Sequence, residues 1–299
     1  MAAEAVHLSA LVDGLALPGL PGGLRALLSL AGEARGLALA RLGAVFVDLP
    51  YFDRFPLKAA RYAAGLPQPP SAWGDAFHQE RPVAVGAAML AEARTLRAGG
   101  DPLRADRLDA LALGYFSHLA VDYATHGRIN QMAEARARKR GAASAHHHEI
   151  EKYQSVLFHE QRNGFDFMGT PLLSRYVRVE HELLLGDATL VRAVRSAIGR
   201  ALGRAPSERE LGRWARGYRQ YGWLLGSPAG KRLAPPAGKE RERPRVFAAP
   251  GAHYLDLFTV AVRRVGRYLE AAWAAREGAP LDPVAVPEGS IDHPPLEPP

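Results

Sequence analysis

The stretch GYFSHLAVDYATHGRIN, residues 114–130, carries imidazole and carboxylate groups at a regular spacing. His118, Asp122 and His126 follow one another at intervals of four residues. Each interval turns an α-helix by about 400°, so successive side chains drift by only about 40° and share one helix face. Imidazole nitrogen and carboxylate oxygen are the ligands that zinc takes where thiolate is absent, and the chain has no cysteine. The pattern therefore predicts a metal-binding helix face.

A second histidine–carboxylate set lies in HHHEIEKYQ, which begins at His146. His147 and Glu151 are four residues apart and would share a helix face, and His148 with Glu151 is an alternative at three residues. Taken alone, such a histidine run is usually a solvated helix start. An aspartate half-buried between two histidines, in contrast, needs a partner or a metal ion. Taken together, the candidate residues therefore favour a metal site more than any one of them does alone.

Three upstream residues extend the candidate set. Asp48 lies in GAVFVDLPYFD where an apolar helix meets a proline, and His78 lies in DAFHQERP just before a predicted helix. His7 lies near the start of the chain, on a segment with apolar spacing. These positions are far apart in sequence, so a common site forms only if the fold brings them together.

The order and spacing of these ligands resemble those of the zinc-dependent phospholipase C family, whose fold is shared with zinc-dependent single-strand nucleases. The resemblance covers roughly residues 7–164 and is carried by GAVFVDLPYF, AFHQERP, GYFSHLAVDYATH and the His147-x-x-x-Glu151 segment. It implies a largely helical single domain that binds two to three Zn²⁺ ions.

The resemblance also implies how the ligands are shared among the metal ions. Carried over by position, they form three sets: Asp48, His78, His118 and Asp122 for the first zinc; His126, His147 and Glu151 for the second; and His7 with a bridging Asp122 for the third. In the family an N-terminal tryptophan also chelates the third ion. This chain departs from that pattern, because it has no tryptophan near its start.

For the activity, the resemblance implies hydrolysis of a phosphodiester by a metal-activated water, with a phospholipid-like substrate. Asp48 and Asp122 are the expected catalytic residues, the first orienting or deprotonating the water and the second bridging metal ions. The alternatives are a nuclease or nucleotidase acting on single-stranded nucleic acid, and a non-catalytic helical protein whose metal ions are structural. Contact with a membrane surface is compatible with the first function, and no protein partner is predicted.

Charge and composition agree with an anionic ligand. The 299 residues include 38 Lys and Arg against 31 Asp and Glu, a net charge of +7. A basic balance favours phosphate esters, nucleic acid or acidic lipid surfaces. The lack of cysteine excludes disulfide scaffolds, thiol nucleophiles and Cys-ligated zinc. We see no signal peptide or membrane span, so we expect a cytoplasmic protein, with a secreted mature form as the alternative.

Ala, Leu and Arg dominate the chain, with apolar residues at helical spacing, which predicts an all-α fold of one compact multi-helix domain over residues 1–277. Ser207 and Glu210 have the spacing of a capping box. The proline-rich stretches 49–75 and 226–251 are predicted to be irregular, and residues 278–299 an extended or disordered tail. The predicted helices cover residues 23–42, 82–98, 105–126, 145–164, 187–203, 208–225 and 254–276, with a shorter one near His7.

Two further features have alternative interpretations. An aromatic stripe of Trp214, Tyr218, Tyr221 and Trp223 runs along the helix predicted over residues 208–225. Such a stripe more often packs in a core than binds lipid or bases. The basic run RARKR, residues 136–140, is predicted to join the two ligand helices as a solvated segment, with an electrostatic contact to anionic lipid or nucleic acid as the alternative.

Overall fold

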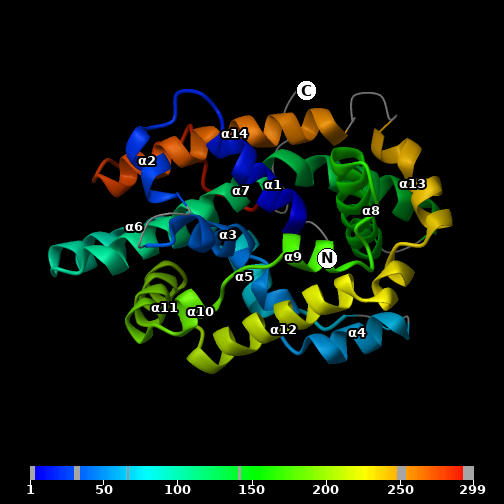
Figure 1. Ribbon diagram of the computed structural model, residues 1–299, viewed down its shortest axis with the longest axis horizontal. Coiled ribbons are helices and arrows are strands. Elements are labelled where there is room, and N and C mark those ends of the chain that lie inside the picture. The colour runs from blue at the N-terminus through cyan, green and yellow to red at the C-terminus, as the bar shows by residue number, and fades with distance from the viewer. Residues whose placement is uncertain are drawn as a thin grey trace.

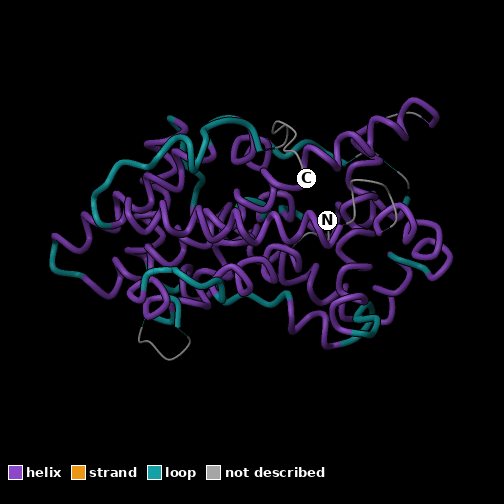
Figure 2. The backbone as a smooth tube through the Cα atoms, turned by 90° about the horizontal axis from the view of Figure 1, so that it is seen from above, coloured by secondary structure: helices purple, strands orange, loops and turns teal. Residues whose placement is uncertain are grey.

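The computed structural model describes residues 4–29, 34–64, 66, 68–140, 143–247 and 254–291, with side chains described for all of these except residues 138–140 and 143–145. The described residues form helices and loops, with no strand among them (Figures 1 and 2). This confirms the predicted all-α fold. Within this part of the chain, no helix combines the length and the apolar character that crossing a bilayer requires.

The helices follow one another in this order: α1 (Glu4–Leu15), α2 (Gly22–Leu27), α3 (Gly36–Phe46), η1 (Leu49–Phe52), α4 (Phe55–Ala63), α5 (Ala72–Gln79), α6 (Pro82–Ala98), α7 (Pro102–Arg140), α8 (Ala143–Asn163), α9 (Pro171–Tyr176), α10 (Glu182–Leu185), α11 (Ala188–Leu202), α12 (Glu208–Gly226), η2 (Pro228–Leu233), α13 (Pro236–Phe247) and α14 (Tyr254–Arg276). Here η marks a 3-10 helix.

Helix α7 is the centre of the packing. It contacts α3, α6, α8 and α14, and nearly every residue from 108 to 122 is buried. A helix that is apolar on all sides belongs in a core rather than at a surface. In Figure 1, α14 lies along the upper edge of the molecule and α12 along the lower edge, with α1 and α3 between them. The ligand-bearing face of α7 is therefore enclosed by other helices.

The α3 and α7 backbones cross almost in contact at two glycines. A Cβ atom added at Gly114 would lie 1.9 Å from the carbonyl oxygen of Ala40, and one added at Gly43 would lie 2.1 Å from that of Leu111. Only glycine leaves room for so close an approach. Because Asp48 follows α3 directly, this crossing brings it towards the ligand face of α7.

Several predicted elements match the structure closely. The helices predicted over residues 82–98, 187–203, 208–225 and 254–276 correspond to α6, α11, α12 and α14, and the segment near His7 is α1. The capping box at α12 is also present. The Glu210 N–H donates to Ser207 Oγ at 3.2 Å, and the Ser207 N–H donates to Glu210 Oε2 at 2.8 Å.

The single helix predicted over residues 23–42 is wrong, because α2 ends at Leu27 and α3 begins at Gly36. A Cβ atom at Gly36 would lie 1.8 Å from the Leu27 carbonyl oxygen, so the two helices meet at that glycine. Arg35 precedes it in the left-handed region, with φ of 52°. Apolar spacing runs through both helices and does not reveal the break.

The prediction of irregular structure over residues 49–75 and 226–251 is also wrong for most of these positions, which form η1, α4, α5, η2 and α13. Pro50, Pro56 and Pro228 lie in the first turns of η1, α4 and η2. The missing N–H is not needed there, so proline begins a helix instead of ending one. Residues 248–251 lie outside the described residues.

Two other predicted segments differ from the structure, one in where it ends and the other in how far it is buried. Helix α7 continues to Arg140 instead of ending at residue 126, so the basic run ends that helix and does not form a separate linker. After α14, residues 279–291 contain no helix, yet Val286 and Ile291 are each only 2% exposed. The Ile291 N–H donates to the His78 carbonyl oxygen at 2.9 Å. Residues 292–299 lie outside the described part, and the domain boundary at residue 277 stays a prediction.

Candidate metal centre

Asp122 lies at the centre of a group of histidines. Its Oδ1 is 3.3 Å from His7 Nε2 and 3.4 Å from His126 Nε2. Its Oδ2 is 2.9 Å from His118 Nε2 and 3.6 Å from His78 Nε2. The structure thus brings imidazoles from α1, α5 and α7 to one carboxylate, which is only 2% exposed.

Asp48 lies beside this carboxylate, at the junction of α3 and η1, and its Oδ1 is 3.3 Å from His78 Nε2. Two overlapping groups could hold a metal ion here, and the ligand atoms within each group lie within 4.8 Å of one another. The groups are His7 with Asp48 and His118, and His78 with His118 and Asp122. Five of the predicted ligands therefore converge.

The remaining predicted ligands form a third group, His126 with His147 and Glu151, whose ligand atoms also lie within 4.8 Å of one another. Glu151 Oε1 is 3.3 Å from the Nε2 atoms of both histidines. The alternative ligand His148 lies 3.5 Å from Glu151 Oε2, but its side chain is 63% exposed. Of the two, His147 is better placed to face the buried carboxylates.

Backbone carbonyls hold two of the imidazole rings by their other nitrogen. His118 Nδ1 lies 2.8 Å from the Ala44 carbonyl oxygen of α3, and His78 Nδ1 lies 2.8 Å from the Gly74 carbonyl oxygen one turn earlier in α5. A carbonyl oxygen can only accept, so Nδ1 must carry the hydrogen in both rings. In the neutral ring, Nε2 then presents a lone pair to the carboxylates, which is the tautomer a metal ligand requires.

The distance between two facing atoms of the cluster indicates whether these side chains suit a cation. His118 Nε2 and Asp122 Oδ2 lie 2.9 Å apart, yet neither has a hydrogen-bonding partner of acceptable geometry. A lone pair and a carboxylate oxygen that close repel each other unless a proton or a metal ion lies between them. In a tetrahedral zinc site, bonds of about 2.0–2.1 Å place neighbouring ligand atoms about 3.3 Å apart. The separations of 2.9 to 3.6 Å around Asp122 fit that requirement.

The ionisation of Asp122, Glu151 and His7 agrees with ligand chemistry, whereas for His118 the effect of burial is outweighed by Asp122 and Asp48, which raise its pKa. Burial alone would raise the pKa of Asp122, but the facing imidazoles, above all His118, hold it below its usual value. The same balance, with His147 as the largest lowering contribution, depresses the pKa of Glu151. Burial and the adjacent His118 lower the pKa of His7 to about 4. Ionised carboxylates and neutral imidazole are the forms that bind metal ions.

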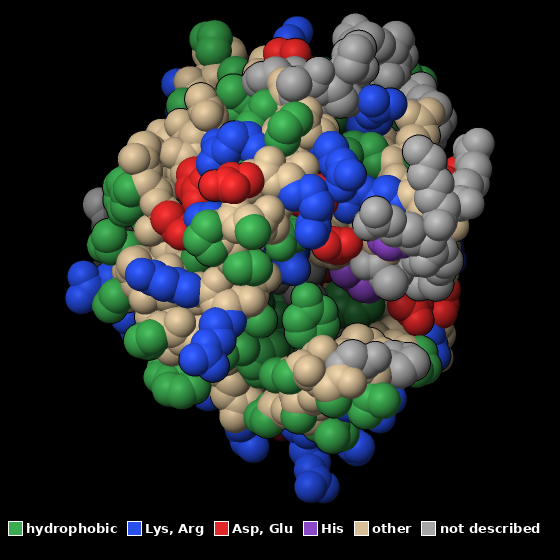
Figure 3. Space-filling view, turned by 90° about the vertical axis from the view of Figure 1, so that its right-hand side faces the viewer, with side chains coloured by type: hydrophobic (Ala, Val, Ile, Leu, Met, Phe, Trp, Pro, Cys, Tyr) green, Lys and Arg blue, Asp and Glu red, His purple; other side chains and the backbone are tan. Residues whose placement is uncertain are grey.

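A hollow of about 250 Å³, partly open to solvent, reaches this centre. Its lining includes His7, Asp122, His126 and Glu151, together with Tyr254 from α14. Figure 3 shows a hollowed face of the molecule, with histidine side chains at the edge of the hollow and Lys and Arg side chains near them. The cluster is thus buried without being sealed.

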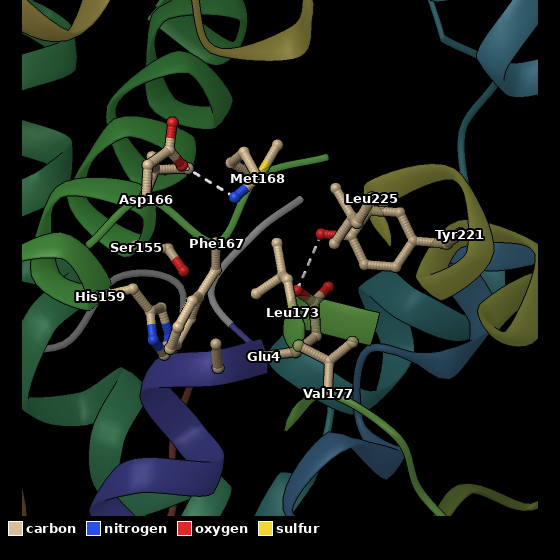
Figure 4. A pocket seen from close by; sticks show the side chains of 12 residues that line it. Glu4, Ser155, His159, Asp166, Phe167, Met168, Leu173, Val177, Tyr221 and Leu225 are labelled. Carbon is tan, nitrogen blue, oxygen red and sulfur yellow. Dashed lines mark hydrogen bonds between the residues drawn. The ribbon is translucent and has the colours of Figure 1, made fainter. Parts of the chain in front are cut away.

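A second hollow, of about 330 Å³, lies next to the first part of α1 (Figure 4). It is lined by Glu4, which precedes His7 by one helical turn, and by Tyr221, whose hydroxyl donates to Glu4 Oε2 at 3.1 Å. Burial raises the pKa of Glu4 to about 7. His159, which follows Glu151 by two turns, lines this hollow and belongs to none of the three ligand groups.

Sequence reasoning missed Asn130, which orients a candidate ligand. His147 Nδ1 lies 2.8 Å from Asn130 Oδ1, so the amide holds the ring that faces Glu151. Asn130 follows His126 by four residues on α7. Extending the four-residue spacing by one more step would have placed it on the ligand face.

The described residues thus form an all-α fold that gathers imidazoles and carboxylates into three groups that could hold a metal ion. A family model described as zinc dependent phospholipase C matches residues 24–196, more than half of the chain. The chain therefore belongs to the zinc-dependent phospholipase C family. The matched residues include every candidate ligand except His7. No curated protein and no solved structure gives a significant match to the chain.

Proposed function

We propose that this protein is a zinc-dependent hydrolase of phosphodiesters that acts on a phospholipid in the manner of a phospholipase C. Family membership supports this class of activity. The observation that carries the proposal is the position of Asp122, whose two oxygens face four imidazoles at 2.9 to 3.6 Å. A carboxylate so placed can be shared between neighbouring dications, as hydrolysis of a phosphate ester by a metal cluster requires.

Two to three Zn²⁺ ions are proposed, held by the following sets: Asp48, His78, His118 and Asp122; His126, His147 and Glu151; and His7 with Asp122 and Asp48. When bound, zinc supplies Lewis acidity and lowers the pKa of a water molecule towards neutrality. The three carboxylates leave the filled centre with an excess of positive charge, which suits a phosphodiester anion.

Residues of the chain itself would orient the ligands and the attacking water molecule. The carbonyl groups of Ala44 and Gly74 hold the rings of His118 and His78 in one tautomer. The Asp48 side chain is 18% exposed, against 3% for Asp122. Asp48 is therefore the more solvent-accessible of the two carboxylates, and we assign it the role of orienting a water molecule or taking its proton, whereas Asp122 serves as a bridge between ligand sets.

Elemental analysis and product analysis test the proposal together. The purified chain should contain about two to three zinc ions and release diacylglycerol from phospholipid. Asp122→Asn should lose both zinc and turnover, whereas Asp106→Asn, a change on the same helix outside the cluster, should keep them. A chain that takes up no zinc after reconstitution would remove the proposal. Release of mononucleotides from single-stranded nucleic acid, with no product from phospholipid, would move the assignment to the nuclease alternative.

A further inference from the structure

The aromatic stripe of α12 has one member that does not pack in the core. Trp214, Tyr218 and Tyr221 are each at most 3% exposed, whereas Trp223 is 73% exposed. One exposed apolar side chain is ordinary on a protein surface. Whether the exposed Trp223 side chain has a binding role depends on the side chains around it.

On α12 itself, Trp223 shares its face with two arginines. Arg219 precedes it by four residues and Arg216 by seven, so all three point to the same side of the helix. Arg216 is exposed, and Arg219 is 57% exposed. The outer face of this helix is therefore basic, with an aromatic ring at its C-terminal end.

The segment of residues 169–178 runs along the same half of α12. The Gly169 N–H donates to the Leu225 carbonyl oxygen at 2.8 Å, and the Tyr218 hydroxyl donates to the Val177 carbonyl oxygen at 2.9 Å. This segment exposes Leu172, at 47%, beside a helix that exposes Trp223. Two apolar side chains thus emerge from neighbouring elements.

Exposed basic side chains lie on the same elements as these two residues and on η2. A Cβ atom at Gly169 would lie 2.5 Å from Lys231 Cγ, which places η2 against the same segment. Among the described residues, Arg219 is the only cation of the group with an ion pair, to Glu182 at 2.8 Å. We call this surface the α12 patch; it consists of Leu172, Arg175, Arg178, Arg216, Arg219, Trp223, Lys231 and Arg232, all exposed.

We propose that the α12 patch docks the protein on a bilayer that contains anionic phospholipid. Tryptophan prefers the interface between head groups and acyl chains. Each cation near an anionic leaflet strengthens binding by about fivefold. Two apolar side chains within a group of mostly unpaired cations combine both contributions, so the charge complementarity favours a lipid surface.

The position of the α12 patch relates docking to catalysis, and this step rests on the proposed phospholipase activity. Leu173 and Leu225 line the hollow beside Glu4, and each is close in sequence to an apolar residue of the patch. Glu4 in turn lies one turn of α1 before His7. A bilayer held against the patch would therefore lie on the elements that line this hollow, one turn of α1 away from the first candidate ligand.

Vesicle co-sedimentation tests the docking surface directly. The probes are vesicles of phosphatidylcholine alone and vesicles with about one third phosphatidylglycerol. The native chain should bind the anionic vesicles more tightly, and the triple variant Arg175→Ala, Arg178→Ala, Arg216→Ala should weaken that binding about hundredfold. Trp223→Ala should weaken binding to both vesicle types on the order of tenfold.

A matched control lies at the start of α7 and on α11. Leu103 is 39% exposed and Arg192 is exposed, so the double variant Leu103→Ala, Arg192→Ala removes one apolar residue and one cation elsewhere. Its vesicle binding should stay within about twofold of the native value. Equal thermal unfolding midpoints for all variants would show that folding is unchanged.

The outcomes separate this inference from the proposed function. Native binding that the triple variant retains in full, or no native binding to anionic vesicles, would overturn the docking surface even if short-chain phospholipid is hydrolysed in solution. Vesicle binding that depends on the patch, in a chain that binds no zinc, would support the docking surface and overturn the proposed enzyme. Patch-dependent binding to single-stranded DNA with none to vesicles would identify a nucleic-acid surface and contradict the lipid assignment.

Discussion

The candidate metal centre has an inner half and an outer half that are built differently. Around Asp122, the side chains of His7, His78 and His118 are at most 3% exposed. In the other half, the side chain of His147 is 18% exposed and that of Glu151 is 11% exposed. His126, at 8%, lies between them and faces both carboxylates.

The two halves also differ in what holds their ligands. The Ala44 carbonyl of α3 orients His118, so that ring depends on how α3 and α7 cross, and the Gly74 carbonyl orients His78 within α5. A side-chain amide, that of Asn130, orients His147. Substituting a side chain that only orients a ligand should therefore alter the outer half, whereas the orientation of His118 in the inner half should change only when the helix crossing changes.

The largest difference should come from the two carboxylates. Removing a metal ligand should cost more than the about 10–100-fold loss that follows removal of a ligand's outer partner. Asp122→Asn should therefore lower kcat/KM by more than about 100-fold and reduce zinc in both halves. Glu151→Gln should empty the outer half and leave about the zinc content of the inner one. Zinc per chain and steady-state kinetics would check this, and equal zinc loss in both variants would contradict the division.

The helix crossing beneath the inner half should show the next largest effect. Gly114→Ala would force α7 away from the Ala40 carbonyl oxygen and destabilise the fold by about 3 kcal/mol or more. Gly212→Ala on α12 is the matched control, because no heavy atom lies within 4 Å of its added Cβ. That change should stabilise by up to about 1 kcal/mol. Denaturant unfolding of the two variants measures both values, and similar midpoints would mean that the crossing is not as tight as described.

Acid stability can separate the fold from the metal centre. His181 is 2% exposed, and neither ring nitrogen has a hydrogen-bonding partner among the described residues. Burial lowers its pKa to about 4. Between the unfolded pKa of about 6.5 and the folded value, the unfolded chain binds more protons at His181 than the native chain does. The free energy of unfolding therefore falls as the pH drops through this range, by up to about 3 kcal/mol.

The variant His181→Leu should therefore flatten the fall in stability over this window. Urea unfolding of metal-free protein at a series of pH values measures it. An unchanged slope would place the acid sensitivity in other buried groups, such as His159 or the ligand cluster.

The smallest effect should be at Asn130. Asn130→Ala leaves every candidate ligand in place but frees the ring of His147, so zinc affinity of the outer half should fall on the order of tenfold. The inner half should keep its zinc. Competition with a chelator of known affinity would resolve the two classes of site, and equal weakening of both would argue against separate halves.

The sequence predicted the local parts of this architecture and missed the parts set by close contact. Four-residue spacing correctly places His118, Asp122 and His126 on one face, because helix geometry alone determines it. Residue type made Asp48 and His78 candidates, but only the family resemblance assigned them to the same metal site as the residues of α7, since nothing local shows that α3 and α5 approach α7. Metal binding by these residues stays a prediction.

Other misses have physical causes of the same kind. The break before Gly36 depends on contact between two helices, and the exposure of Trp223 depends on which side of α12 is covered. Neither can be obtained from apolar spacing. Prolines in the stretch 49–75 predict an end to regular structure as readily as a beginning, and only the fold shows that Pro56 begins a helix.

The unbroken course of α7 has a consequence for sequence change. One continuous helix carries His118, Asp122, His126 and Asn130, so their angular positions are locked together. Insertion or deletion of a single residue within this stretch would rotate everything beyond it by about 100° and disengage one set of donors from the other. A variant can therefore exchange residues between these positions, but it cannot change the length of the stretch and keep the centre.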